Sequence, residues 1–190
     1  MRTFIRKYCL LFVSLTILGS FSCNKKAVST SETVKEEAKE ILWLSFPNMV
    51  SAQKSKPKKV FIDFYTDWCG WCKKMDASTF KHPVIVKYIN KNFYAVKFNA
   101  ETKDTIKHNG HTYINGSNPR ATHPLAASLM NNKPSYPTSV YLDEELNLLG
   151  PVAGYMDAKM FEAVLHFYVE EAYKTTPWNT YYENFQGEIQ

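Results

Sequence analysis

The chain has 190 residues, of which 45% are hydrophobic and 22% are charged, an ordinary composition for one globular domain with extensions. Its formal net charge is +5, and it falls to +2 without residues 1–22, which carry three basic side chains and no acidic one. A nearly neutral remainder gives no electrostatic case for nucleic-acid binding, so we expect no nucleic-acid partner.

The N-terminal segment has the pattern of an export signal. Three basic residues precede an apolar run at 8–18 that is too short for a mature spanning helix: Arg2, Arg6 and Lys7. Small residues then lead to Cys23. The segment resembles a bacterial lipoprotein signal, which implies a signal peptide at 1–22 and lipidation of Cys23. Ordinary cleavage nearby and an uncleaved membrane anchor are the alternatives.

The cysteine count becomes informative once export is assumed. Of the four cysteines, Cys9 would leave with the signal and Cys23 would carry lipid, so Cys69 and Cys72 remain. An exported protein with a single close pair has no structural disulfide framework. The pair is therefore a working dithiol or a metal clip.

The chain from residue 23 to residue 65 predicts a tether followed by three elements. Residues 23–40 have little to bury, and we expect them to be a flexible tether. A short strand is predicted at 41–44, and Ser45 can cap a helix that runs to about residue 53. The apolar run at 60–65 predicts a buried strand of the parallel-sheet kind.

A helix is predicted to begin near Gly70 and to end at residue 78 or 80, before Pro83. The thiol of Cys69 would then lie at the helix N-terminus, where unpaired N–H groups and the macrodipole favour a thiolate. A thiolate is the species that attacks disulfides.

The middle of the chain predicts a βαβ unit and then a segment without pattern. A helix is expected up to residue 92, followed by a strand at 93–98, which completes a right-handed unit with the strand before the cysteines. Residues 99–122 predict a long polar loop, or one short helix flanked by loops. Thr122 can cap a helix that has Pro124 in its first turn.

The last third predicts a hairpin and two helices. Strands are expected at 136–142 and 146–149, and Gly154 closes the sheet region. Asp157 can cap a long amphipathic helix. Thr176–Pro177 has N-cap and first-turn chemistry for a short aromatic helix, which we expect to pack on the domain.

With this order of elements, the chain resembles the thioredoxin superfamily from about residue 41 to residue 173. The motif Trp68-Cys69-Gly70-Trp71-Cys72-Lys73 is similar to the thioredoxin active-site segment, with tryptophan where thioredoxin has proline. Tyr136-Pro137-Thr138 matches the family loop that carries a cis-proline facing the dithiol.

The resemblance implies an α/β thioredoxin fold, with a central mixed β-sheet flanked by helices. The domain would cover residues 41–175, with an insertion at about 100–122 before the third core helix. Residues 176–190 would form a C-terminal extension that contains the aromatic helix.

The resemblance also implies roles for residues. Cys69 would be the exposed nucleophile, and Cys72 the buried resolving thiol. Asp63 lies where thioredoxins keep a buried acid that assists proton transfer at the second cysteine, and Lys97 matches the lysine that pairs with it. No cofactor beyond the redox-active disulfide is expected. The substrate-binding residues would be Trp68, Gly70, Trp71, Tyr136, Pro137 and Gly154.

Similarity to exported thioredoxin-like lipoproteins and to periplasmic reductant-delivering domains implies a function. We expect a monomeric thiol–disulfide oxidoreductase, lipid-anchored in the periplasm, that acts on protein disulfides. No histidine lies between the cysteines, which favours the reducing direction, with a membrane or periplasmic electron donor. One alternative is a copper or zinc module that uses the two cysteines and a histidine. Separately, His108 and His111 could hold a metal together with His123. Another is a thioredoxin-fold scaffold whose insertion and tail dock a partner.

Overall fold

The structure is a computed structural model that describes residues 38–190. The predicted signal peptide, the lipidation site Cys23 and most of the predicted tether lie outside the described residues. Within the described part, no helix is long and apolar enough to cross a membrane.

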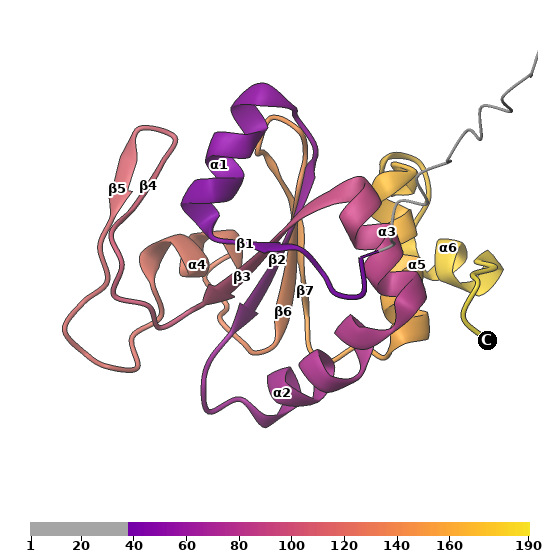
Figure 1. The fold of residues 1–190 in the computed structure, drawn as a ribbon, viewed down its shortest axis with the longest axis horizontal. Coiled ribbons are helices and arrows are strands. Elements are labelled where there is room, and N and C mark those ends of the chain that lie inside the picture. The colour runs from indigo at the N-terminus through magenta and orange to yellow at the C-terminus, as the bar shows by residue number, and fades with distance from the viewer. Residues whose placement is uncertain (1–37) are drawn as a thin grey trace, which may run out of the picture. The chain divides into compact units, whose positions relative to one another are not determined.

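A five-stranded sheet forms the centre of the fold, with strand order β1-β3-β2-β6-β7 (Figure 1). Strands β1, β2 and β3 are mutually parallel, whereas β6 and β7 run antiparallel to their neighbours. The predicted mixed sheet is therefore confirmed. The strands are β1 Trp43–Leu44, β2 Lys59–Tyr65, β3 Phe93–Asn99, β6 Thr138–Leu142 and β7 Leu148–Ala153.

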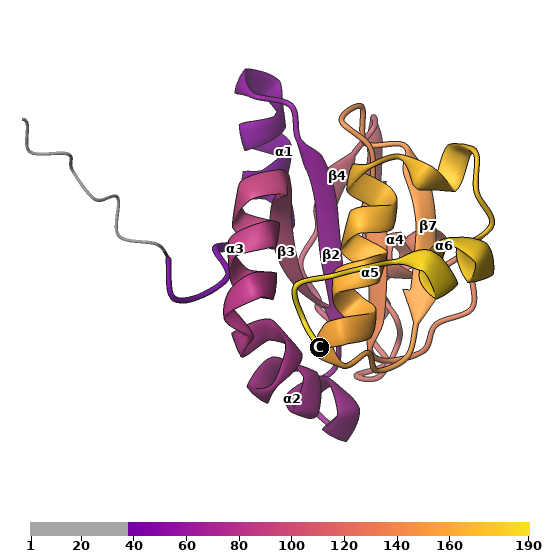
Figure 2. The same cartoon turned by 90° about the vertical axis from the view of Figure 1, so that its right-hand side faces the viewer.

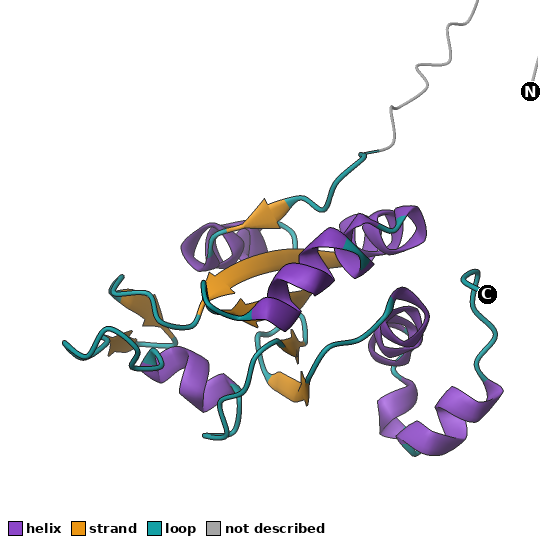
Figure 3. Ribbon diagram, turned by 90° about the horizontal axis from the view of Figure 1, so that it is seen from below, coloured by secondary structure: helices purple, strands orange, loops and turns teal. Residues whose placement is uncertain are grey.

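Helices cover both faces of this sheet, and Figure 3 shows the strands between two groups of helices. Alternation along β2 explains the two layers, because Phe61 packs with α2, α3 and α5 while Val60 and Ile62 pack with α1 and α4. The helices are α1 Phe46–Ser55, α2 Gly70–Ala77, α3 Pro83–Asn92, α4 Pro124–Leu129, α5 Ala158–Val169 and α6 Trp178–Asn184, with short 3-10 turns at Thr79–Lys81 and Ala172–Lys174.

The predicted βαβ unit consists of β2, α2, α3 and β3, and it positions the cysteines. Every residue of β2 pairs with one of β3, from Lys59 beside Phe93 to Tyr65 beside Asn99. Cys69 lies only four positions after Tyr65, the last residue of β2, so α2 starts at the carboxyl edge of the sheet. This is the edge at which α/β folds bind their ligands.

The prediction for residues 99–122 is wrong in part, because they contain a two-stranded hairpin. Strand β4 Ile106–His108 pairs with β5 His111–Tyr113. Asn109 and Gly110 form the turn with φ of 49° and 76°, the left-handed conformations that a tight hairpin needs. Each strand has three residues, too few to show an alternating pattern.

Two predicted helix caps are also wrong. His123, not Thr122, precedes α4, and its ring nitrogen accepts the N–H of Leu125 at 3.3 Å. Helix α6 begins at Trp178, so Pro177 rather than Thr176 is its cap residue. The predicted caps Ser45 and Asp157 are confirmed, since each accepts a backbone N–H of the first helical turn.

The second strand of the predicted hairpin starts later than expected and extends further. Leu146 lies in the turn with φ of 66°, so β7 begins at Leu148 and runs to Ala153. The antiparallel pairing with β6 is as predicted.

The C-terminal aromatic helix packs on the domain, as predicted. Phe167 of α5 contacts Trp178 and Tyr181 of α6, with ring centroids 5.3 and 5.1 Å apart. The chain then crosses α5 (Figure 2), where the buried Glu162 carboxylate accepts the N–H groups of Glu188 and Ile189 at 2.8 and 3.0 Å.

Candidate active site

The two cysteines form a disulfide where β2 leads into α2. Cys69 and Cys72 have Cα atoms 5.3 Å apart. Cys69 is the N-cap of α2, and its sulfur accepts the N–H of Cys72 at 3.1 Å. Gly70 is the first residue of the helix. A thiolate formed at Cys69 on reduction would keep this N–H donor and the positive end of the helix dipole, both of which lower a thiol pKa.

Both cysteines are buried in this oxidised form, with 4% of Cys69 and 2% of Cys72 exposed. The prediction of an exposed Cys69 is therefore wrong here, because its sulfur turns inward to bond with Cys72 and to accept a helix N–H. The neighbouring Trp68 and Trp71 are each 56% exposed. The two indole side chains of the motif, and not its two sulfur atoms, are thus exposed to solvent.

Asp63 lies in the middle of β2 and is 1% exposed. The strand register places it beside Lys97, whose ammonium donates to Oδ2 at 2.6 Å. Its other oxygen, Oδ1, has no hydrogen-bond partner among the described residues. Burial raises the pKa of Asp63 to about 6, although Lys97 opposes the shift. Asp63 can therefore gain or lose a proton near neutral pH.

A second carboxylate, Asp76, shares the same lysine, and it is not among the predicted site residues. Asp76 lies on α2, four residues after Cys72, so both side chains lie on one face of the helix. Its carboxylate also pairs with Lys97, and its negative charge adds to the rise in the pKa of Asp63. Burial lowers the pKa of Lys97, but the two carboxylates outweigh it and raise that pKa above its usual value.

A cleft of about 310 Å³ opens beside this charge group, where Lys97 is 22% and Asp76 42% exposed. The Lys97 ammonium also lies over the Tyr65 and Trp43 rings, 4.9 and 5.2 Å from their centroids. The cleft gives the charge group access to solvent. Its lining residues are Glu40, Ile41, Trp43, Asp76, Phe80, Lys81 and Lys97.

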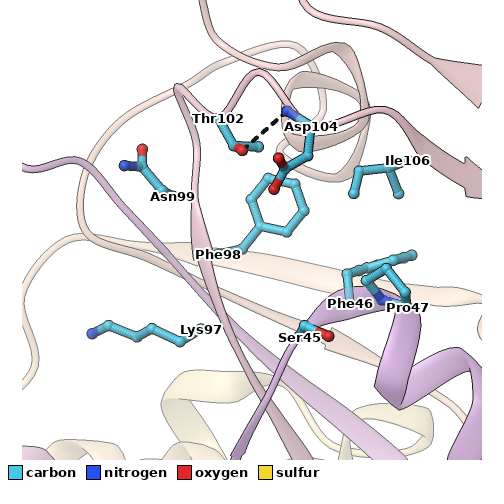
Figure 4. A pocket seen from close by; sticks show the side chains of 9 residues that line it. All are labelled: Ser45, Phe46, Pro47, Lys97, Phe98, Asn99, Thr102, Asp104 and Ile106. Carbon is cyan, nitrogen blue, oxygen red and sulfur yellow. Dashed lines mark hydrogen bonds between the residues drawn. The ribbon is translucent and has the colours of Figure 1, made fainter.

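A smaller hollow of about 140 Å³ lies between the start of α1 and the chain after β3 (Figure 4). The ammonium of Lys97 points away from Asp104, so only the stem of the lysine lines this side. The Asp104 N–H is bonded to Thr102 Oγ1 at 3.2 Å. Neither cysteine lines this hollow, and the Lys97 ammonium contacts Asp63.

Two aromatic pairs flank the motif. Trp68 contacts Tyr136 edge-on at 6.0 Å, and Trp71 contacts Tyr155 at 5.3 Å. Lys74 places its ammonium 4.7 Å from the Trp71 ring centroid and 4.9 Å from that of Tyr155. Tyr155 was not predicted, although it directly follows the predicted Gly154.

The loop before β6 has the predicted geometry. The Tyr136–Pro137 peptide bond is cis. Gly154 has φ of 100° and donates its N–H to the Pro137 carbonyl at 2.8 Å. The structure therefore brings Pro137 and Gly154 together.

The histidines proposed for a metal site have other partners. His123 is fully buried, with one ring nitrogen 3.1 Å from the Asp104 carbonyl and the other accepting the Leu125 N–H. His108 and His111 face each other across the hairpin. The described residues include no group of three or more His, Cys, Asp or Glu side chains that could hold a metal ion.

Comparison with known proteins identifies the family. Residues 46–168 match the thioredoxin-like domain. The chain belongs to this family. With its Cys69–Cys72 disulfide, it is a thioredoxin-like oxidoreductase.

Two relatives and one solved structure illustrate the similarity. The thiol:disulfide interchange protein DsbD of Cronobacter sakazakii is 30% identical over 115 residues, 60% of this chain and 17% of the relative. DsbD of Vibrio vulnificus is 26% identical over 86 residues, 40% of this chain and 14% of the relative. The chain thus spans less than a fifth of these relatives. A solved DsbH oxidoreductase shares the fold, with a TM-score of 0.52 and 16% identity over 74% of this chain and 92% of that one.

Proposed function

We propose that this protein reduces disulfides in polypeptides outside the cytoplasm. The observation that carries the proposal is the placement of the Cys69–Cys72 disulfide at the N-terminus of α2, on the strand–helix unit that also holds Asp63 with its raised pKa. The helix end favours a thiolate at Cys69, and a carboxyl with a pKa near neutral suits proton transfer at Cys72.

In the first step, the reduced protein has a thiolate at Cys69 and a thiol at Cys72. The Cys69 sulfur attacks one sulfur of the substrate disulfide, the substrate S–S bond breaks, and one substrate thiolate leaves. The product is a mixed disulfide between Cys69 and the remaining substrate sulfur.

In the second step, Asp63 takes the proton from Cys72. The Cys72 thiolate attacks the Cys69 sulfur, the mixed disulfide breaks, and the second substrate thiolate leaves. The substrate has gained two electrons, and the protein is left with the Cys69–Cys72 bond that the structure contains. A reduced dithiol protein, at a membrane or in the periplasm, would restore the two thiols by the reverse exchange.

Three observations support the location and the direction. The relatives are named thiol:disulfide interchange proteins. Residues 1–23 have the pattern of an export and lipidation signal, and neither residue between the cysteines is a histidine. We therefore propose a lipid anchor at Cys23 and a monomeric domain 41–175 that meets its protein partners outside the cytoplasm.

The activity is tested by reducing insulin with the pure protein and dithiothreitol. We expect turnover by the native chain and loss of turnover in Cys69→Ser and in Cys72→Ser. Turnover that survives in both active-site variants would overturn the proposal.

The direction is tested by a redox titration of the Cys69–Cys72 pair. We expect a potential nearer that of thioredoxin, about −270 mV, than that of the oxidant DsbA, about −120 mV. A value near the oxidant's would overturn the reducing direction and leave the exchange chemistry intact. The anchor is tested by membrane fractionation of Cys23→Ser, which we expect to release the protein.

A further inference from the structure

Near each of its ends, the insertion at about residues 100–122 is hydrogen-bonded to one member of an aromatic pair, Trp68 and Tyr136; Trp68 directly precedes Cys69. At its start, Glu101 Oε1 accepts the indole N–H of Trp68 at 2.9 Å. At its end, the hydroxyl of Thr122 is hydrogen-bonded to the hydroxyl of Tyr136 at 2.9 Å. Trp68 and Tyr136 meet edge-on, with an angle of 83° between the rings.

The two ends of the insertion are also tied to each other. The N–H of His123 donates to the carbonyl of Ala100 at 2.7 Å. The side-chain amide of Asn115 donates to the carbonyls of Thr102 and Ala121 at 2.9 and 2.8 Å. The contacts therefore form a closed ring from Trp68 through both ends of the insertion to Tyr136 and back to Trp68, so that a shift of either aromatic ring would break one of these hydrogen bonds.

The rest of the insertion is anchored away from the disulfide. His108 of β4 packs edge-on against Phe46 of α1, with ring centroids 5.3 Å apart. In Figure 1 the hairpin extends beside α1, while the segment after β5 lies toward the end of the sheet at which α2 begins. Anchored on α1, the insertion can hold the aromatic pair without occupying the disulfide itself.

We propose that the insertion selects extended polypeptides as substrates, with Thr122 and Glu101 as the positioning residues. This inference rests on the proposed function and names what that same site prefers. The rings of Trp68 and Tyr136, 6.0 Å apart, span about two residues of an extended chain, which rises about 3.3 Å per residue. A small disulfide can react through contact with the active-site sulfurs alone. A polypeptide would also contact the rings of Trp68 and Tyr136.

Thr122→Val tests the end of the insertion, because valine keeps the shape and removes the hydroxyl that holds Tyr136. Tyr136→Phe removes the same hydrogen bond from the other side. We expect each variant to raise KM for insulin about three- to tenfold, the range that one lost hydrogen bond supports. The ratio of kcat/KM on insulin to kcat/KM on hydroxyethyl disulfide should fall by the same factor.

The double variant Thr122→Val, Tyr136→Phe shows whether the two single substitutions raise KM through the same hydrogen bond or independently. Since both substitutions remove the same hydrogen bond, we expect the double variant to be no worse than the poorer single one. Thr112→Val on β5 is the matched control, and we expect it to behave as the native protein. Glu101→Leu tests the other end, and we expect the same rise in KM for insulin.

A structural or redox role would give a different result. The inference is overturned if the variants lose activity equally on both substrates, if the potential of the disulfide shifts with KM, or if the two single effects add. The inference is also overturned if the native protein reduces insulin and both Thr122→Val and Glu101→Leu have the native KM for insulin. A native protein inert on both disulfides would instead overturn the proposed function.

Discussion

Strand β2 carries two buried charged side chains, one at its start and one near its middle, and their environments differ. At the start, Lys59 is 6% exposed and contacts Glu144 at 3.1 Å and Glu171 at 3.2 Å. Four residues later, Asp63 is 1% exposed and contacts Lys97. In both places a lysine lies between two carboxylates.

The difference is which partner is buried. At the first site the buried group is the cation, and its two carboxylates are 40% and 44% exposed, so water can complete their hydrogen bonds. At the second, the fully buried group is the Asp63 carboxylate, and its Oδ1 has no partner among the described residues. A buried carboxylate with an unsatisfied oxygen favours its protonated form. The proton-transfer role proposed for Asp63 therefore depends on the site with the unsatisfied carboxylate, and not on the site around Lys59.

Lys97→Met should have the largest effect on stability. The variant leaves Asp63 buried without a cation, and near pH 8, where Asp63 is ionised, we expect a loss of about 3–5 kcal/mol in the free energy of unfolding. Near pH 5 the native Asp63 is already largely protonated, because its pKa is about 6, so the loss should shrink. Urea unfolding of the oxidised protein at both pH values measures this, and equal losses would contradict our account of the site.

Asp63→Asn should have the opposite sign. Below the unfolded pKa of about 4 the carboxyl is neutral in both states, and the variant should match the native protein. As the pH rises through the folded pKa of about 6, the native protein must keep a charge in the core and loses relative stability. The difference is about two pKa units, so we expect the variant to be more stable by about 3 kcal/mol near pH 8.

The same variant should be a poorer enzyme. The variant removes the carboxylate that we propose as the acceptor of the Cys72 proton, so we expect insulin reduction near pH 7 to slow at least about tenfold. A variant that is more stable and equally active would place Asp63 outside the mechanism.

Lys59→Met tests the satisfied site. Both carboxylates can return to water, so we expect a loss of about 1 kcal/mol that hardly changes between about pH 6 and pH 9. Insulin reduction should match that of the native protein, since Lys59 belongs to the end of β2 away from the cysteines. A loss of activity would remove the distinction between the Lys59 site and the Asp63 site.

The sequence predicts the active-site core because its determinants are local. An apolar run predicts β2, the spacing of the cysteines on the next helix predicts the N-cap position of Cys69, and the resemblance implies the pairing of Asp63 with Lys97 that the register confirms. Asn109-Gly110 is a hairpin-turn sequence, but the strands on either side of it are too short and too polar to show an alternating pattern.

Other features depend on packing between distant segments. Asp76 has a helical spacing to Cys72, but only the tertiary structure shows that it shares Lys97. The burial of Cys69 follows from the direction of its sulfur, and the bond between Thr122 and Tyr136 joins elements that no local pattern connects. The roles of the substrate-binding residues remain predictions.

Asp76→Asn should have the smallest effect, since it leaves the buried pair of Asp63 and Lys97 intact. The negative charge of Asp76 raises the pKa of Asp63, and Asp76 also pairs with the Lys97 ammonium that Asp63 contacts. Removal of the Asp76 charge should therefore lower the pKa of Asp63 from about 6 by less than about one unit. Carbon NMR of the Asp63 carboxyl in the oxidised protein measures the midpoint directly. Asp67→Asn is the matched control, because that exposed carboxylate bonds Asn99 and not Lys97. A midpoint that rises in Asp76→Asn would show that Asp76 holds Lys97 in place for Asp63 and does not compete for it.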